Sequence, residues 1–368
     1  MIQIQTMDPK IISIFLAERR GTGPDVFFVD SANKKIQQNQ ALFKPQYQFA
    51  YDVQFVSDIE KADMVMIPQP IYEDSPETRE YVKGITRLAV RTSSHSSSST
   101  SPHTIPTLLF IGGDLSHTLN FPGTFVLKAT QYKSLLKLND VIIPAFCEDF
   151  GLLYGMNIRK KSAKPVVSFC GWAGFPTFRN RAKYLIRNFI IELKKLIKFD
   201  PSLEVFKKGI YFRRKALRLL SNSGLVQAKF ITRNSFSGHS KTISLSPEQA
   251  REEYVANMLD SDFVLAPKGD GNYSVRFFEA LSCGRIPILI DTDVCLPLED
   301  VIDYSKFIIR VNHRDIKKLP EIVSRVYESL SDEKFADMQK AARQAFETYL
   351  RYDSFFNTIL PQICLKNK

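Results

Sequence analysis

The sequence is poor in the residues that build metal centres and disulfide frameworks. Among its 368 residues are five cysteines and five histidines. The cysteines are scattered, odd in number and never spaced as CxxC, which argues against both a disulfide framework and a zinc site. The histidines have no metal-ligand spacing either. We therefore expect no metal site.

Long apolar runs are also absent. No stretch approaches the ~20 consecutive apolar residues that cross a bilayer. The N-terminal residues, MIQIQTMDPKIISIFLAERR, carry an acid early and lack the charge pattern and the cleavage site of a signal peptide. These features predict a cytoplasmic protein that is at most peripheral to a membrane.

Positive charge is in excess. The chain has 50 Lys and Arg against 39 Asp and Glu, a formal net charge of +11. Such a charge favours acidic partners, namely nucleotide-sugars, phospholipid head groups or nucleic acid. Nucleic-acid binding would need clustered basic residues with interleaved aromatics. Here the basic residues are spread, and densest over 159–187 and on to Arg218. We therefore expect an anionic substrate or a membrane surface, and no nucleic acid.

Short apolar runs alternate with helical stretches along the chain. At 368 residues it is long for one core, so two domains are expected. A basic run at 159–164, followed by Pro165, marks the joint. The pattern predicts an α/β protein of two doubly wound domains that face a cleft. They occupy 1–164 and 165–345, and a tail at 346–368 packs back on the first.

Individual elements follow from the same patterns. Expected strands lie at 9–16, 25–30, 64–67, 107–111, 141–143, 166–170, 263–266 and 286–290. Expected helices lie at 77–90, 177–198, 247–259, 275–282 and 332–349. Residues 203–214 and 228–232 each fit a strand or a connecting segment, and the Ser-rich residues 92–104 fit a mobile surface loop.

One stretch, residues 262–291, organises the second half. It reads as a strand, a glycine-bearing loop, a helix and a second strand. Ser274 stands at the N-cap position of the helix. Arg276 and Glu279 are three residues apart, which places them as neighbours on one helix face.

That loop and helix offer groups that hold an anion. Glycines let backbone N–H groups approach a phosphate, and a helix N-terminus favours negative charge. Lys268 and Arg276 add full charges, and Glu279 can accept hydrogen bonds from the two hydroxyls of a ribose. The stretch therefore predicts a pocket for a nucleotide diphosphate. The alternative is a surface Arg–Glu pair at helical spacing.

Acids follow the predicted strands of the first half. Asp114, Glu148 and Asp149 fall at strand carboxyl ends, where open parallel sheets bind ligands. The alternative for each is a helix cap or a solvated loop acid. Arg179 starts the long basic helix at 177–198 and is a candidate for a second anion site, with a solvated helix face as its alternative.

Residues 274–291, SVRFFEALSCGRIPILID, resemble the characteristic segment of the exostosin-type glycosyltransferases, family 47 of the sequence-based classification. Further segments are similar to other landmarks of that family, in the same order along residues 57–311. They are SDIEKADMVMIP (57–68), FIGGD (110–114), DVIIP (140–144), FRNR (178–181) and LPL (296–298).

The resemblance implies the GT-B fold, in which two Rossmann-like domains face a cleft. It also implies a UDP-sugar donor, inversion at the sugar carbon and no essential metal or other cofactor. Carried over by position, Arg276 and Glu279 would hold the nucleotide, and Arg179 would neutralise the diphosphate. By local chemistry the phosphate loop includes Lys268, Gly269 and Ser274.

The implied reaction needs two kinds of group. Negative charge grows on the departing diphosphate and must be stabilised by cations and a helix N-terminus. The attacking hydroxyl needs one general base. Asp114 is the first candidate, followed by Glu148 and Asp149. The sequence shows no N-terminal anchor like that of eukaryotic members, which favours a bacterial or viral glycan or lipid-linked saccharide as acceptor.

Other interpretations remain open. Asp291-Thr-Asp293 is a DxD, a metal-binding triplet in GT-A enzymes. Gly269-Asp-Gly271 is half of a dinucleotide fingerprint, but Ser274 holds the third glycine position, which argues against a dehydrogenase. A GDP-fucose transferase would use a similar donor loop on the same architecture. From another class, a basic nucleic-acid-binding protein or a non-catalytic interaction protein is the alternative.

Overall fold

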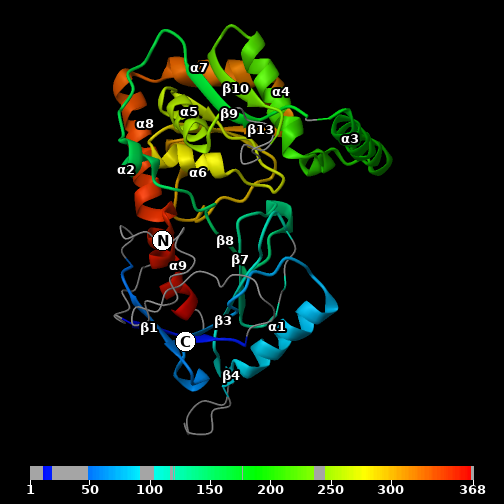
Figure 1. Cartoon of the computed structure of the whole chain (residues 1–368), viewed down its shortest axis with the longest axis vertical. Helices are drawn as coiled ribbons and strands as arrows, with labels where there is room; N and C mark the ends of the chain where they lie inside the picture. The colour runs from blue at the N-terminus through cyan, green and yellow to red at the C-terminus, as the bar shows by residue number, and fades with distance from the viewer. Residues whose placement is uncertain are drawn as a thin grey trace. The chain divides into compact units, whose positions relative to one another are not determined.

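The computed structural model describes residues 11–18, 49–91, 103–116, 119, 121–175, 177–235 and 245–365. The chain separates into two compact units, and each is considered by itself (Figure 1). Unit 1 consists of Met1–Gln131, Leu135–Phe146 and Thr348–Lys368, and unit 2 of Tyr132–Ser134 and Cys147–Glu347.

The joint between the units differs from the sequence-based boundary after Lys164. Residues 147–164 group with unit 2. Two contacts account for this: the Arg159 side chain pairs with the buried Asp262 at 2.8 Å, and the Gln339 side-chain amide hydrogen-bonds to both the N–H and the C=O of Arg159. The basic run at 159–164 is therefore part of unit 2, where Arg159 forms an ion pair, and it is not a linker between the units.

In the described part of unit 1, parallel strands form one sheet in the order β2-β1-β3-β6-β7-β8. The strands are β1 (Ile11–Leu16), β2 (Asp52–Val56), β3 (Met64–Met66), β6 (Thr107–Phe110), β7 (Thr124–Lys128) and β8 (Asp140–Ile142). β4 (Val90–Arg91) and β5 (His103–Thr104) pair antiparallel. The helical segments are η2 (Ile59–Lys61), α1 (Pro76–Leu88) and α9 (Tyr352–Leu365), with η3 (Lys133–Leu135) at the boundary.

The sheet of unit 1 is stabilised by apolar burial and one buried ion pair. Val65, Leu109 and Val126 on neighbouring strands pack with Val82 of α1. α1 starts where the sequence signals a start: Ser75 accepts a hydrogen bond from the Thr78 N–H, and proline holds the first helical position. Lys128 and Asp140, both fully buried on β7 and β8, pair at 2.9 Å.

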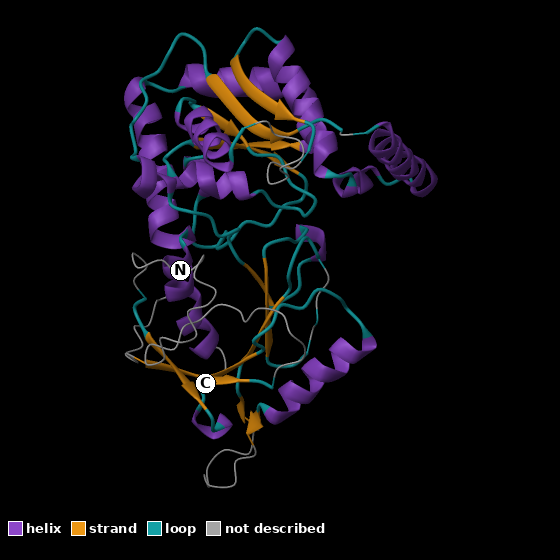
Figure 2. Cartoon of the chain, in the orientation of Figure 1, coloured by secondary structure: helices purple, strands orange, loops and turns teal. Residues whose placement is uncertain are grey.

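In the described part of unit 2, a second parallel sheet has the order β10-β9-β11-β12-β13 (Figure 2). Its strands are β9 (Val166–Trp172), β10 (Gln227–Arg233), β11 (Phe263–Leu265), β12 (Ile286–Asp291) and β13 (Ile309–Asn312). β9, β11 and β12 are almost wholly buried, as expected of strands covered on both faces.

The α-helices of unit 2 are α2 (Phe150–Tyr154), α3 (Phe178–Lys198), α4 (Gly209–Asn222), α5 (Pro247–Leu259), α6 (Val275–Ser282), α7 (Leu319–Ser329) and α8 (Asp332–Ala345). The shorter segments are η4 (Pro201–Phe206), η5 (Tyr304–Lys306), η6 (His313–Lys318) and the π-turn η7 (Phe346–Leu350), which reaches into unit 1.

The strand order places a topological switch between β9 and β11. From β9 the chain crosses to β10 on one side, then returns to β11 on the other. The loops after the two strands therefore diverge at the strand carboxyl ends, and doubly wound sheets bind ligands in the crevice that such a switch point creates. The residues after β9 and after β11 are thus candidates for a ligand-binding site.

The predicted α/β class with two parallel sheets is confirmed. The predicted helices at 177–198, 247–259 and 275–282 are confirmed to within a residue. The cleft between the two domains stays a prediction. The expected strand at 25–30 and most of the loop at 92–104 lie outside the described residues.

Two predicted elements were wrong. Residues 203–214 are neither a strand nor a connecting segment but η4 and the start of α4, because the buried Ile210, Ala216 and Leu220 follow helical spacing. The helix expected at 332–349 ends at Ala345, and a π-turn and α9 follow it.

Candidate functional site

Arg276, in the first turn of α6, occupies the crevice between β9 and β11. Its Nη2 donates a hydrogen bond of 2.7 Å to the Cys170 carbonyl at the end of β9. The guanidinium lies over the Phe169 ring, 4.3 Å from its centroid, and 5.8 Å from that of Tyr254. Its Nε is buried and has no hydrogen-bond partner. The aromatic rings thus orient the cation while part of its donor capacity stays unused.

Gly171 makes room for that guanidinium. Its φ is +148°, and a Cβ added there would lie 2.8 Å from Arg276 Nη2. A similar close approach occurs at Gly209, the first residue of α4, where a Cβ would lie 2.1 Å from the carbonyl oxygens of Lys268 and Gly269. The loop after β11 is therefore seated directly on the start of α4.

Glu279 lies one turn after Arg276 and faces the same tyrosine. The Tyr254 hydroxyl, from α5, donates to Glu279 Oε2. Burial raises the pKa of the Glu279 carboxyl, against the opposing effects of Tyr254 and Arg276. Among the described residues Arg276 and Glu279 do not form an ion pair with each other, so the surface-pair alternative does not describe this arrangement. Both side chains contact Tyr254, and Arg276 also contacts the end of β9.

A second arginine, which the sequence analysis missed, joins Arg276. Arg213 of α4 donates to the Trp172 carbonyl at 2.6 Å and to the Lys268 carbonyl at 3.4 Å, and its guanidinium lies 5.8 Å from the Phe169 ring centroid. Burial, together with nearby Arg276, lowers the pKa of Arg213 to about 10. Its Nε is also buried without a partner.

Two guanidinium groups therefore share one aromatic ring at the carboxyl end of β9. Like charges this close are costly unless an anion lies near them. The available signal was the Arg-Arg pair at 213–214, but the helix that carries it was interpreted as a strand or a connecting segment. Tyr254 was missed because only the three-dimensional fold brings α5 beside α6.

The predicted phosphate loop is rigidly anchored, and Lys268 is its internal support. Lys268 Nζ donates to Tyr132 Oη at 3.2 Å and to the Val205 carbonyl, and its ammonium lies over the rings of Tyr132 and Phe212. Burial lowers the pKa of Lys268 to about 7. The amine points into the protein, so it holds the loop in place and does not present its charge at the loop surface.

The rest of that loop is closed by its own hydrogen bonds. The Gly269 N–H donates to the Tyr273 carbonyl at 2.7 Å. Asn272 donates to the carbonyls of Thr292 and Asp293, both at 3.2 Å. Ser274 precedes α6 in an extended conformation and makes no side-chain cap hydrogen bond, which leaves the first N–H groups of α6 without that partner.

The DxD acids serve the structure of unit 2. Asp291 pairs with Arg310 at 2.8 Å and accepts from the Val294 N–H. Asp293 accepts from the N–H and the hydroxyl of Ser134. Because both carboxylates are engaged in this way, the arrangement does not support a metal role for the triplet.

The three candidate bases are placed quite differently. Asp149 is buried, caps α2 by accepting from the Leu152 N–H, and pairs with Arg343. Glu148 pairs with Arg251 of α5. Asp114, in unit 1, is exposed and lies three residues beyond Ile111, which forms a parallel bridge with Ile71. For Asp149 the helix-cap alternative therefore describes the structure.

Arg179 is not brought to the Arg276 group by any contact within the described residues. It is exposed in the first turn of α3, whose N-cap is Thr177. Its placement matches the alternative of a solvated basic helix face. Its role at the diphosphate stays a prediction.

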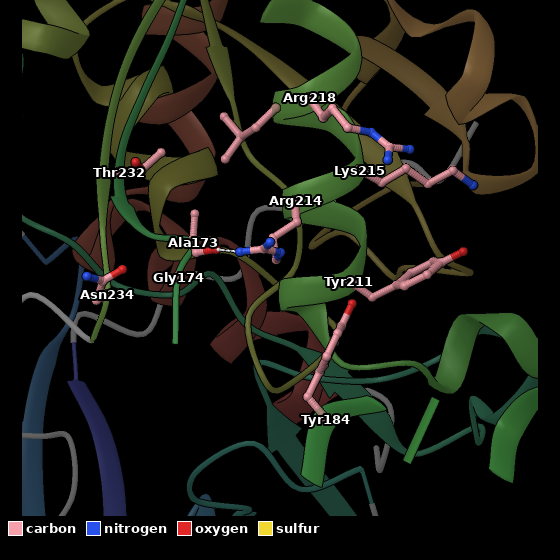
Figure 3. A pocket seen from close by; sticks show the side chains of 10 residues that line it. Ala173, Gly174, Tyr184, Tyr211, Arg214, Lys215, Arg218, Thr232 and Asn234 are labelled. Carbon is pink, nitrogen blue, oxygen red and sulfur yellow. Dashed lines mark hydrogen bonds between the residues drawn. The ribbon is translucent and has the colours of Figure 1, made fainter. Parts of the chain in front are cut away.

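A cationic pocket of about 660 Å³ adjoins the end of β9 on its α4 side (Figure 3). Arg214 donates to the Ala173 carbonyl at 2.8 Å, while Lys215 and Arg218 extend from the same helix. Its lining contains no acid and consists of Ala173, Gly174, Tyr184, Tyr211, Arg214, Lys215, Leu217, Arg218, Thr232 and Asn234. Two consecutive arginines of α4 thus donate to two consecutive carbonyls at the end of β9. Arg213 donates to Trp172 in the crevice, and Arg214 donates to Ala173 in this pocket.

An α/β unit with two arginines at a topological switch point has the arrangement in which doubly wound sheets bind ligands. Comparison with known proteins identifies the family. Residues 205–326 match the family model described as the Exostosin GT47 domain. That region includes α4, α5, α6 and the loop after β11. This part of the chain is therefore similar to the exostosin-type GT47 glycosyltransferases, and the resemblance found in the sequence is confirmed.

Curated relatives agree. The chain is 33% identical over 104 residues to an exostosin-1 homolog of Caenorhabditis elegans, covering 28% of this chain and 26% of that protein. It is 35% identical over 79 residues to exostosin-1 of Drosophila melanogaster, covering 22% and 10%. A probable glycosyltransferase of Arabidopsis thaliana is 29% identical over 120 residues, covering 31% and 24%. The chain thus matches about a quarter or less of the length of these relatives.

A crystal structure of TarM superposes with a TM-score of 0.36 at 11% identity, covering 71% of this chain and 50% of that chain.

The expectation of a cytoplasmic protein was wrong. Several of the relatives are exostosins, which are Golgi membrane-type enzymes. Within the described residues, no helix has both the length and the apolar character that a membrane span requires.

Proposed function

We propose that the protein is an inverting glycosyltransferase that moves a sugar from a UDP-sugar to a saccharide or lipid-linked saccharide acceptor, without a metal. The observation that carries this proposal is the pair Arg213 and Arg276 over Phe169, each with a buried and unpartnered Nε, at the end of β9. The family match and the names of the relatives support the class of reaction.

The donor would lie across the crevice with its diphosphate at the arginines. Negative charge that grows on the leaving diphosphate would be stabilised by Arg213, Arg276 and the N-terminus of α6. These groups supply the charge that a metal would otherwise bring. Lys268 would contribute indirectly, because its amine is committed to Val205 and Tyr132.

Glu279 would hold the ribose. One of its oxygens accepts from Tyr254, which fixes the rotamer of the carboxylate. The other oxygen would accept from the ribose hydroxyls. This arrangement explains why a carboxylate lies beside two cations without forming a salt bridge to Arg276.

Asp114 remains our first choice for the general base. Asp149 is committed to its helix cap and to Arg343, and Glu148 to Arg251. Asp114 is the exposed acid at the carboxyl end of a parallel sheet, which is where an acceptor hydroxyl would meet a base.

The test is calorimetry of UDP binding with and without EDTA. Arg276→Ala should weaken UDP binding about tenfold to hundredfold, because a charge-assisted bond to phosphate is lost. Arg276→Lys should recover only part of the affinity, since lysine lacks the guanidinium fork. The matched control is Arg325→Ala on the exposed face of α7. Melting temperatures check that each variant is folded.

Other outcomes decide between the alternatives. GDP bound more tightly than UDP would favour a GDP-sugar transferase. UDP binding that disappears with EDTA would contradict metal independence. Equal UDP affinity in the native protein and in folded Arg276→Ala would contradict the proposed site.

A further inference from the structure

α3 is unusual among the helices of unit 2 because no side chain on it is buried. It spans Phe178–Lys198, begins at the N-cap Thr177, whose side chain accepts from the Asn180 N–H, and ends at Phe199 in a left-handed conformation. At 1.5 Å per residue it is about 30 Å long. Figure 1 shows it standing apart from the sheet of unit 2, at the side where η4 lies.

The solvent face of α3 is apolar. Leu185, Ile186, Phe189, Leu193, Leu196 and Ile197 are each 45–70% exposed, at spacings of three and four residues that align them on one face. The aromatic rings of Phe178 and Phe199, at the two ends, are 83% and 93% exposed.

The opposite side of α3, which contacts η4, carries ion pairs. Lys195 pairs with Glu204 of η4 at 3.5 Å, and Glu192 pairs with Lys207 just after it. A helix that packs on a protein in water directs its apolar stripe inward and its polar face outward. In α3 the apolar face points to solvent and the ion-paired side contacts the protein. We therefore expect a partner other than η4 to cover the apolar face.

Basic residues surround the apolar face. α3 carries Arg179, Arg181, Lys183, Arg187, Lys194 and Lys198 in addition to Lys195, against a single acid, Glu192. Among the described residues, none of those six has an acidic partner within 4 Å. A second copy of this chain would bring the same positive charge and be repelled. The complementary surface is apolar within and anionic at its border, as an anionic bilayer is.

We propose that α3 docks the protein on an anionic phospholipid surface, lying in the plane of the interface with its apolar face among the acyl chains. Lys194 and Lys198 contact the lipid phosphates. Docking in this way goes beyond the transfer reaction. It identifies the region of unit 2 that faces the lipid when the acceptor is membrane-bound.

The experiment is flotation of the full chain with vesicles of phosphatidylcholine alone or mixed with phosphatidylserine. Binding to the mixed vesicles is expected. Phe189→Ser with Ile197→Ser should weaken that binding by about tenfold or more, because apolar area in the interface is lost. The matched control is Leu138→Ser, which removes a side chain that is 99% exposed outside α3.

A charge-reversal pair tests the lipid phosphates separately. Lys194→Glu with Lys198→Glu should abolish the preference for phosphatidylserine and flatten the dependence on salt. Lys334→Glu, at an exposed position on α8, should change neither.

Three results would overturn the proposal. The first is no binding to either vesicle. The second is a lower melting temperature of the α3 variants without lipid, which would mean that the chain itself covers the face. The third is a concentration-dependent dimer that the variants lose, which would mean a second copy does so. UDP affinity of the same variants should stay unchanged, so the two proposals can fail separately.

Discussion

At the scale of single residues, the candidate site depends on arginines that donate to backbone carbonyls but have no acidic partner in the part of the chain that the structure describes. Arg276 and Arg213 each donate to a backbone carbonyl and lie over Phe169, yet neither contacts a carboxylate within the described residues. A buried donor without a partner costs about 1–3 kcal/mol. A bound diphosphate would recover that cost, which is why such pairs favour anion binding.

The lowered pKa of Lys268 predicts how the free energy of unfolding depends on pH. Its pKa is about 7 in the folded protein, below its ordinary value of 10.5, so between these values the unfolded chain binds more protons. Stability should therefore rise as the pH increases from 7 towards 10, with a slope of up to about 1.4 kcal/mol per pH unit from this group. Below pH 7 both states are protonated and the contribution is constant.

The measurement is urea unfolding of the native protein and of Lys268→Met between pH 7 and 9. The rise in the free energy of unfolding should be smaller in Lys268→Met, which has no amine to titrate. Lys334→Met, at an exposed position, should follow the native protein. Parallel curves for native and Lys268→Met would show that the buried amine is not the cause.

At the scale of elements, the crevice depends on close approach between strand ends and helix starts. Gly171 at the end of β9 and Gly209 at the start of α4 permit contacts that a side chain would block. Neither glycine belongs to the loop that resembles a phosphate-binding motif. The site is therefore formed by three segments, of which the glycine-bearing loop is one.

Gly171→Ala should damage the site more than the fold. The new Cβ would lie 2.8 Å from Arg276 Nη2 and displace the guanidinium from the Cys170 carbonyl. UDP affinity should fall about tenfold, comparable to loss of the Arg276 side chain. The positive φ adds about 1–2 kcal/mol of strain.

The control for that prediction is Gly224→Ala, measured by the same calorimetry and unfolding experiments. Gly224 has a φ of +67°, and a Cβ there would contact nothing within 4 Å. It should show the strain and keep the affinity for UDP. If both variants bind UDP equally well, the steric role of Gly171 is wrong.

At the scale of the whole molecule, the charge of +11 is divided among separate uses. Some cations lie in the crevice, as Arg213 and Arg276 do, and some are buried in structural pairs, as Lys128 is with Asp140. Others lie on α3, around its apolar face. No single feature explains the composition.

This division predicts weak nucleic-acid binding. Duplex DNA titrated at rising salt should bind only at low ionic strength, without preference for sequence, because scattered cations contact few phosphates at once. Fluorescence anisotropy at several salt concentrations is the measurement. Tight binding at physiological salt with a steep salt dependence would instead support the nucleic-acid alternative.

Much of the site could be predicted from the sequence, and the missing part has a clear cause. Arg276, Glu279 and the loop at 268–274 lie within one short stretch, so local spacing identified them. Arg213 and Tyr254 are 63 and 22 residues away from Arg276 in the chain. Only the crossover connections of the parallel sheet bring them to the same strand end.

The sequence by itself determined the α/β alternation, the position of α6 and the family, because periodicity, caps and a contiguous motif act over a few residues. Only the tertiary structure decided which charged side chains remain available to bind a ligand. In the folded chain Asp149 caps a helix, Asp291 pairs with Arg310, and Lys268 donates to a buried carbonyl. The arginines over Phe169 have no acidic partner among the described residues. Pairing depends on burial and distance, and these exist only once distant segments have packed together.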